Sequence, residues 1–155
     1  MDSLSRDRNA DMLPSGSSPL PWLDVAIAAR TSLPVLISAP PELALGMAIE
    51  IAAGTSSSGA DGLVLITASD NGDLRSALMP SDDYGSVRTV VLRDVDVFDD
   101  AQQSALVGLL ADPACDVACA WRVIATTSVP LFDRVMDGSF DERLFYFLNA
   151  IHIVA

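Results

Sequence analysis

Five short runs of apolar residues recur along this chain, and segments with turn or helix signals separate them. Each run is rich in Val, Ile, Leu or Ala at consecutive positions, so a strand made from it is apolar on both faces. Such strands are buried in parallel sheets with helices on two sides. The pattern therefore predicts an α/β fold, a three-layer αβα sandwich with a five-stranded, mostly parallel sheet, whose strands span residues 34–38, 62–67, 88–95, 121–127 and 150–154.

Proline and capping residues indicate where the helices begin. A first helix is expected from Pro21, and a second is expected to open at Pro40-Pro41 and to end at Gly54. The buried side of the second helix is expected to include Leu43, Met47, Ile49 and Ile51. Two later helices are predicted from capping boxes, formed by Asp99 with Gln102 and by Ser139 with Glu142.

The length allows one domain with a tail. The chain has 155 residues, half of them apolar, which is enough for one core. Residues 1–20 lack apolar periodicity, so we expect a flexible tail followed by a domain over 21–155. The polar start contains no signal-peptide core, and no apolar run is long enough to cross a membrane, so we expect a cytoplasmic protein.

The charged residues narrow the classes of partner. Asp and Glu number 21 against 9 basic residues, for a net charge of −12, and every basic residue is arginine. A domain this acidic repels nucleic acid and anionic membranes, so we expect neither as a partner. Without lysine, Schiff-base chemistry and the phosphate-binding lysine of a nucleotide loop are excluded. A GC-rich coding bias would also explain the missing lysine, but the chemical exclusion holds either way.

Candidate metal ligands and nucleophiles are few. Cys115 and Cys119 have no companion histidines and are expected to be ordinary small apolar residues, so no metal site is predicted. His152, the one histidine, lies in the last predicted strand, and the sequence places no nucleophile beside it. Four aspartates follow the third strand, and we interpret them as a strand end and a helix cap: Asp94, Asp96, Asp99 and Asp100.

The junction after the first strand does not favour phosphate. Residues 38–42 read S-A-P-P-E, with no glycine and with two prolines that lack N–H donors. Glu42 adds a negative charge where a phosphate would sit at the start of the helix. Ordinary nucleotide binding through a Gly-rich loop is therefore disfavoured here.

Three later segments carry a resemblance to a known family. Residues 88–98, R-T-V-V-L-R-D-V-D-V-F, resemble the Walker B strand of the AAA+ activators of sigma-54 RNA polymerase, G-T-L-F-L-D-E-I. Residues 122–128, R-V-I-A-T-T-S, resemble their sensor strand R-I-I-A-A-T-N. The block over residues 135–149, V-M-D-G-S-F-D-E-R-L-F-Y-F-L-N, is similar to V-x-x-G-x-F-R-x-D-L-Y-Y-R-L-N and is the most specific of the three. The resemblance covers residues 21–155 and implies a P-loop NTPase fold of AAA+ type.

The departures from the family pattern fall on its ATPase residues. Ala39, Pro40, Pro41 and Glu42 replace the Gly-rich loop, and Arg93 and Asp94 replace the magnesium-binding aspartate and the catalytic glutamate. The sensor asparagine falls at Ser128, and the two late arginines fall at Asp141 and Phe147. The loop that contacts sigma factor and the helical lid have no counterpart in the sequence. We predict a degenerate nucleotide site without cofactor, in which Arg93 pairs with Glu42 or Asp94 and folding requires neither nucleotide nor magnesium.

These departures predict a non-catalytic regulatory module in bacterial transcription or signalling. It would act through a protein partner, either an intact AAA+ activator or further copies of itself. One alternative is an ATPase that still binds ATP. Another is a pseudo-receiver domain that mediates contacts, which the order of the strands in the sheet would distinguish. A phosphate-accepting receiver domain has an acidic pair after its first strand and a lysine late in the chain, and this sequence has neither.

Overall fold

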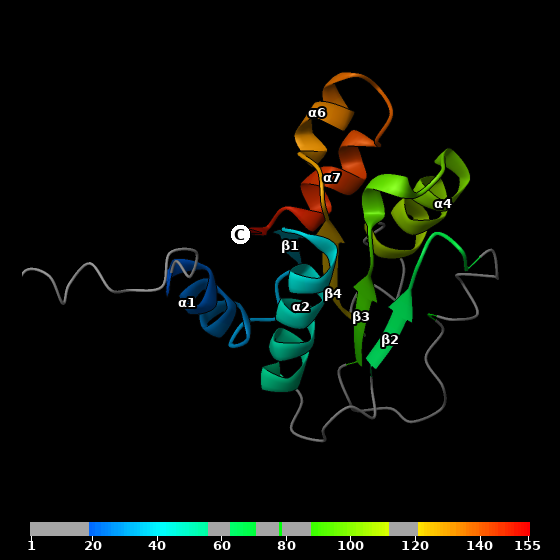
Figure 1. The fold of residues 1–155 in the computed structure, drawn as a ribbon. Helices are drawn as coiled ribbons and strands as arrows, with labels where there is room; N and C mark the ends of the chain where they lie inside the picture. Colours follow the sequence, from blue (N-terminus) through cyan, green and yellow to red (C-terminus); the bar gives the residue numbers. More distant parts are fainter. Residues whose placement is uncertain (1–18, 56–62, 71–77, 79–87, 112–120) are drawn as a thin grey trace, which may run out of the picture.

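The computed structural model describes residues 19–55, 63–70, 78, 88–111 and 121–155 (Figure 1). Within these ranges every strand belongs to one sheet, in the order β2-β3-β4-β1-β5, and all four pairings are parallel. The strands are β1 (Val35–Ser38), β2 (Leu63–Ile66), β3 (Arg88–Leu92), β4 (Trp121–Thr127) and β5 (Ile151–Val154). The predicted five-stranded parallel sheet is confirmed, and so are the bounds of β4. Receiver domains have the order 2-1-3-4-5, so the pseudo-receiver alternative is wrong.

Helices cover both faces of the sheet and complete the predicted three layers. On one face lie α1 (Pro19–Ala28) and α2 (Pro41–Thr55), which pack on β1 and β4 through Ile37 and Ile124. On the other face lie a 3₁₀ turn η3 (Val95–Val97), α4 (Asp100–Leu106) with its π-helical extension η4 (Val107–Ala111), α6 (Leu131–Met136) and α7 (Glu142–Leu148). Because side chains alternate along a strand, Leu36 points to this second face while Val35 and Ile37 point to the first.

Strand β2 departs from the expectation of burial on both faces. It forms one edge of the sheet, and Leu63 and Leu65 are exposed while Ile66 is buried. An edge strand has a neighbouring strand on one side only. The helices α1 and α2 pack over the middle of the sheet, on β1 and β4, and not over β2. Strand β3 is shorter than predicted, because the chain turns at Arg93 and Asp94 and continues as η3.

Three helix boundaries also differ from the sequence predictions. Helix α1 begins at Pro19, ahead of the expected domain start, and α2 continues one residue past Gly54 to Thr55. The capping box at Ser139 is wrong. The N-cap of α7 is Asp141, whose carboxylate accepts hydrogen bonds from the backbone N–H groups of Arg143 and Leu144.

Burial along α2 and the helix α6 also differ from the prediction. Met47 and Ile51 are buried as expected, but Leu43 and Ile49 are exposed. The short helix α6 was not predicted. Most of the predicted tail and both cysteines, Cys115 and Cys119, lie outside the described residues.

Candidate functional site

The predicted site residues gather at one edge of the sheet. All strands run parallel, so their carboxyl ends meet at the same edge, where α/β proteins bind ligands. Ala39, Pro40, Pro41 and Glu42 follow β1, Arg93 and Asp94 follow β3, and Ser128 follows β4. Ser128 is exposed. These residues therefore lie along one edge of the sheet.

The connection from β1 to α2 is too short to form a phosphate-binding cradle. Only Ala39 and Pro40 separate the last residue of β1 from the first residue of α2. The N–H of Ala39 donates to the carbonyl of Thr127 (3.0 Å), and the N–H of Ala44 donates to the carbonyl of Pro40 (2.9 Å). Pro40 and Pro41 have no N–H, so few free donors remain at the start of this helix.

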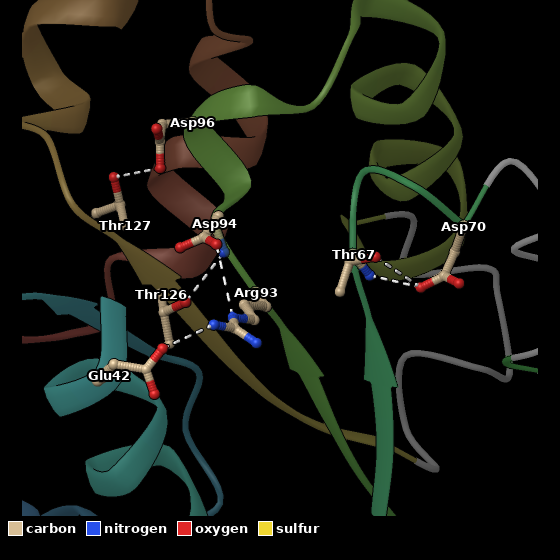
Figure 2. A network of polar contacts seen from close by, with 8 residues as sticks. All are labelled: Glu42, Thr67, Asp70, Arg93, Asp94, Asp96, Thr126 and Thr127. Atoms are coloured by element: carbon tan, nitrogen blue, oxygen red, sulfur yellow. Dashed lines mark hydrogen bonds and ion pairs between the residues drawn. The ribbon is translucent and has the colours of Figure 1, made fainter. Parts of the chain in front are cut away.

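Arg93 pairs with both predicted carboxylates (Figure 2). One guanidinium nitrogen, Nη2, lies 3.5 Å from Oε1 of Glu42, and Nε lies 3.6 Å from Oδ2 of Asp94. The side chains of Arg93 and Asp94 are 29% and 32% exposed, whereas that of Glu42 is 89% exposed. The predicted ion pair is thus confirmed, and it joins the start of α2 to the end of β3.

The backbone at Asp94 turns sharply and is held by β4. Asp94 has φ 53° and ψ 56°, a left-handed conformation that aspartate tolerates better than most residues. Its N–H donates to Oγ1 of Thr126 (3.0 Å), and the N–H of Arg93 donates to the carbonyl of Ile66 (2.8 Å). These two bonds, one to each neighbouring strand, fix the direction in which the Arg93 side chain leaves the sheet.

Two threonines at the same edge make further hydrogen bonds that the sequence did not indicate. Oγ1 of Thr127 donates to Oδ1 of Asp96 (3.0 Å), while Thr67 contacts Oδ2 of Asp70 through its N–H (2.8 Å) and its hydroxyl (3.1 Å). The available signal was position, because each threonine ends or directly follows a strand at the ligand-binding edge.

The aspartates after β3 serve separate structural roles. Asp96 bonds Thr127, Asp99 forms the predicted capping box with Gln102, and Asp100 lies in the first turn of α4. Within the described ranges, no three His, Cys, Asp or Glu side chains gather where they could hold a metal ion.

Structural residues also occupy the two positions at which the resembled family has arginines. Asp141 caps α7, and Phe147 packs against the hydrophobic core. The pKa of Asp141 is lowered, chiefly by the hydrogen bond from the Arg143 side chain, whose Nη2 lies 3.1 Å from Oδ2. Neither position carries a cation that could reach a nucleotide.

His152 has a neighbour that the sequence did not reveal. Oγ of Ser38, at the end of β1, lies 2.7 Å from Nε2 of His152 on the edge strand β5. The structure therefore places beside this histidine a hydroxyl group that the sequence alone did not indicate. The two residues are far apart in sequence, and only the pairing of β1 with β5 brings them together.

The chain is similar to known proteins in structure. No protein-family model and no curated protein matches the chain. NtrX from Brucella abortus in complex with ATP superposes with a TM-score of 0.65 at 20% identity, over 98% of this chain and 39% of that chain. The P-loop NTPase domain of the sigma-54 transport activator from E. coli superposes with a TM-score of 0.61 at 16% identity, over 87% of this chain and 93% of that chain.

The fold is similar to that of a P-loop NTPase domain. A DNA polymerase III gamma subunit-related protein from Thermotoga maritima superposes as well, with a TM-score of 0.57 at 12% identity over 87% of this chain and 45% of that chain. At these identities the likeness concerns the fold alone. The chain corresponds to 39% of the length of NtrX, and among its described helices none is long and apolar enough to span a membrane.

Proposed function

We propose that this domain is a non-catalytic relative of the sigma-54 activator ATPases that regulates bacterial transcription or signalling by binding a protein. The observation that carries the proposal is the position of Arg93. Its guanidinium lies at the end of β3 between Glu42 and Asp94, at the position that the resemblance assigns to the magnesium ligand. A permanent cation there repels magnesium.

The surroundings of Arg93 argue against nucleotide as well. Glu42 places a carboxylate in the first turn of α2, where it interacts favourably with the helix dipole and competes with any phosphate. The short connection through Ala39 and Pro40 provides no cradle of N–H donors. The chain also has no lysine to contact a γ-phosphate.

A protein is a class of partner that fits the composition. A net charge of −12 disfavours nucleic acid and anionic membranes, but not a protein with a basic surface. The candidates are an intact AAA+ activator and a second copy of this chain. A subunit without ATPase residues would alter a ring of active subunits by occupying one place in it.

Calorimetric titration with ATP and magnesium tests the first half of the proposal. We expect no binding heat and no shift of the thermal midpoint, because a ligand raises stability only when it binds the native state. An intact sigma-54 activator ATPase domain is the positive control. Micromolar binding of Mg-ATP would overturn the proposal and favour the residual ATPase.

The second half requires a defined partner. Light scattering after size exclusion reports whether the chain associates with itself, and ATPase assays of an intact activator with added domain report whether it enters that assembly. We expect one of the two, either self-association or altered ATPase activity. A monomer that leaves the activator unchanged would contradict both named partners.

A further inference from the structure

A pocket of about 440 Å³ lies between the carboxyl end of the sheet and the pair of helices α6 and α7, separate from the Arg93 network. These helices stand at the end of the sheet towards which the strands point (Figure 1). The volume falls in the range of small-molecule sites. The pocket is lined mainly by apolar side chains, from Leu36, Pro130, Leu131, Phe132, Phe145 and Tyr146, together with Ser38, Asn149 and His152.

The pocket has aromatic walls that remain open to solvent. Phe132 and Tyr146 are 51% and 63% exposed, although both are large apolar side chains. Phe145 contacts both, with ring centroids 5.9 Å from Phe132 and 5.5 Å from Tyr146 in tilted and edge-on arrangements. A further aromatic ring can pack against such walls in the same offset or edge-to-face geometry.

The polar pair at the pocket comes from two adjacent strands. Leu36 and His152 are register partners on β1 and β5, so their side chains lie on the same face of the sheet. Ser38 follows two residues after Leu36 on that face, which brings its Oγ to 2.7 Å from Nε2 of His152. Partial burial lowers the pKa of His152 and so favours the neutral imidazole.

The charge of the pocket lining and the hydrogen-bonding capacity of Ser38 and His152 indicate which class of ligand the pocket fits. The lining residues include no Asp, Glu, Lys or Arg, so a charged ligand would lose its hydration without a counter-charge. Between a neutral imidazole and a hydroxyl, one hydrogen bond leaves Ser38 either a free O–H or a free lone pair, according to the tautomer. A ligand hydroxyl can both accept and donate, and therefore satisfies either arrangement.

We propose that this pocket binds a small, uncharged aromatic molecule that carries a hydroxyl group, with Ser38 and His152 as its hydrogen-bond partners. The site is distinct from the degenerate nucleotide site, so it does not depend on whether the domain binds ATP or a protein. It gives the domain a place where a small effector binds.

Nuclear magnetic resonance of the single histidine provides a direct test. His152 is the only imidazole in the chain, so its ring proton signals need no further assignment. The probes are 2-naphthol and 2-methylnaphthalene, which match in shape but differ in the hydroxyl. We expect 2-naphthol to shift the His152 signals in a saturable way and to bind about fivefold more tightly, the effect of one net hydrogen bond.

Variants test whether the preference for 2-naphthol over 2-methylnaphthalene depends on the Ser38 hydroxyl. Ser38→Ala should weaken 2-naphthol about fivefold and leave 2-methylnaphthalene unchanged, because it removes one hydroxyl without removing apolar surface. Ser104→Ala, an exposed serine of α4 outside the pocket lining, is the matched control and should change neither affinity. The proposal is overturned if 2-naphthol gives no saturable shift, if the two probes bind equally, or if Ser38→Ala has no effect. Both probes are measured on the unmodified chain first, so the outcome does not depend on how a variant folds.

Discussion

The guanidinium of Arg93 lies 3.5 Å from the carboxylate of Glu42, and this contact joins the end of β3 to the start of α2. Glu42 belongs to the first turn of α2, and Arg93 directly follows β3. With Asp94 on its other side, the arginine has carboxylates within 3.5 and 3.6 Å. Charges that the family resemblance assigns to metal and phosphate are thus supplied here by the chain itself.

This network is expected to contribute little to stability. Glu42 is 89% exposed, and exposed ion pairs are weakened by water and salt. Arg93→Gln should therefore change the free energy of unfolding by less than about 1 kcal/mol. Urea unfolding at low and high salt measures this change in the free energy of unfolding, and Glu42→Gln, which removes the other charge of the pair, is measured in the same way. A loss above about 2 kcal/mol would contradict this account, because it would show a desolvated pair.

His152 should titrate below its ordinary range. Partial burial disfavours the imidazolium and lowers the pKa in the folded state. Stability that is present above the unfolded pKa of about 6.5 is then lost as the pH falls through the lower folded value. Thermal melts between pH 7.5 and pH 5 should therefore fall more steeply for the native chain than for His152→Gln. Equal pH dependence of the two proteins would rule out the lowered pKa.

More of the fold than of the candidate site could be predicted from the sequence. Runs such as residues 121–127 identify buried strands directly, because a strand buried on both faces has no polar alternation. Residues whose role depends on strand pairing were missed. The contact between Ser38 and His152 exists only because β1 pairs with β5, and no local pattern reports that pairing.

Helix ends were predictable only where the capping signal was unambiguous. Asp99 and Gln102 satisfy both bonds of a capping box, and the structure has both. Ser139 and Glu142 match the same spacing, but Asp141 lies nearer the first turn and caps α7 instead. The backbone N–H of Asp141 is also held by the side chain of Gln103 (2.7 Å), a contact from another helix that fixes where α7 begins.

Two glycines of α2 should respond in opposite ways to alanine. A Cβ at Gly54 would lie 2.7 Å from the Cβ of Ala29, too close for the two helical segments to keep their packing. A Cβ at Gly46 meets nothing within 4 Å. Gly46→Ala should stabilise the domain by about 1 kcal/mol through helix propensity, and Gly54→Ala should destabilise it. Chemical denaturation of both variants is the measurement, and a gain in both would show that α1 adjusts freely.

The Asp141 cap should be visible in both mutation and pH. Asp141→Ala removes the acceptor for two backbone N–H groups and should cost about 1 kcal/mol, whereas Asp141→Asn keeps a capping oxygen and should cost less. The lowered pKa means that the charged carboxylate stabilises the fold above about pH 4, and that this contribution is lost as the pH falls through the folded value. Asp141→Asn should lack this acid-dependent loss. The same loss in both proteins would assign it to other carboxylates.

Arg122 offers a test of what a buried charge contributes. Its side chain is 1% exposed on β4, Nη2 donates to the carbonyl of Ala28 at the end of α1, and Nε and Nη1 have no hydrogen-bond partner among the described residues. Burial lowers the pKa of this guanidinium, which means that the surroundings disfavour its charge.

The effect of replacing Arg122 on the free energy of unfolding should therefore depend more on the volume of the new side chain than on the loss of its charge. Arg122→Met keeps most of the packing and removes the desolvation cost, so the free energy of unfolding should stay equal or rise by about 1 kcal/mol. Arg122→Ala leaves a cavity and should lower it by about 3 kcal/mol. Denaturant unfolding of the two variants decides the matter. If the methionine variant loses as much as the alanine variant, the bond to Ala28 stabilises the junction of α1 and β4 by more than burial of the charge costs.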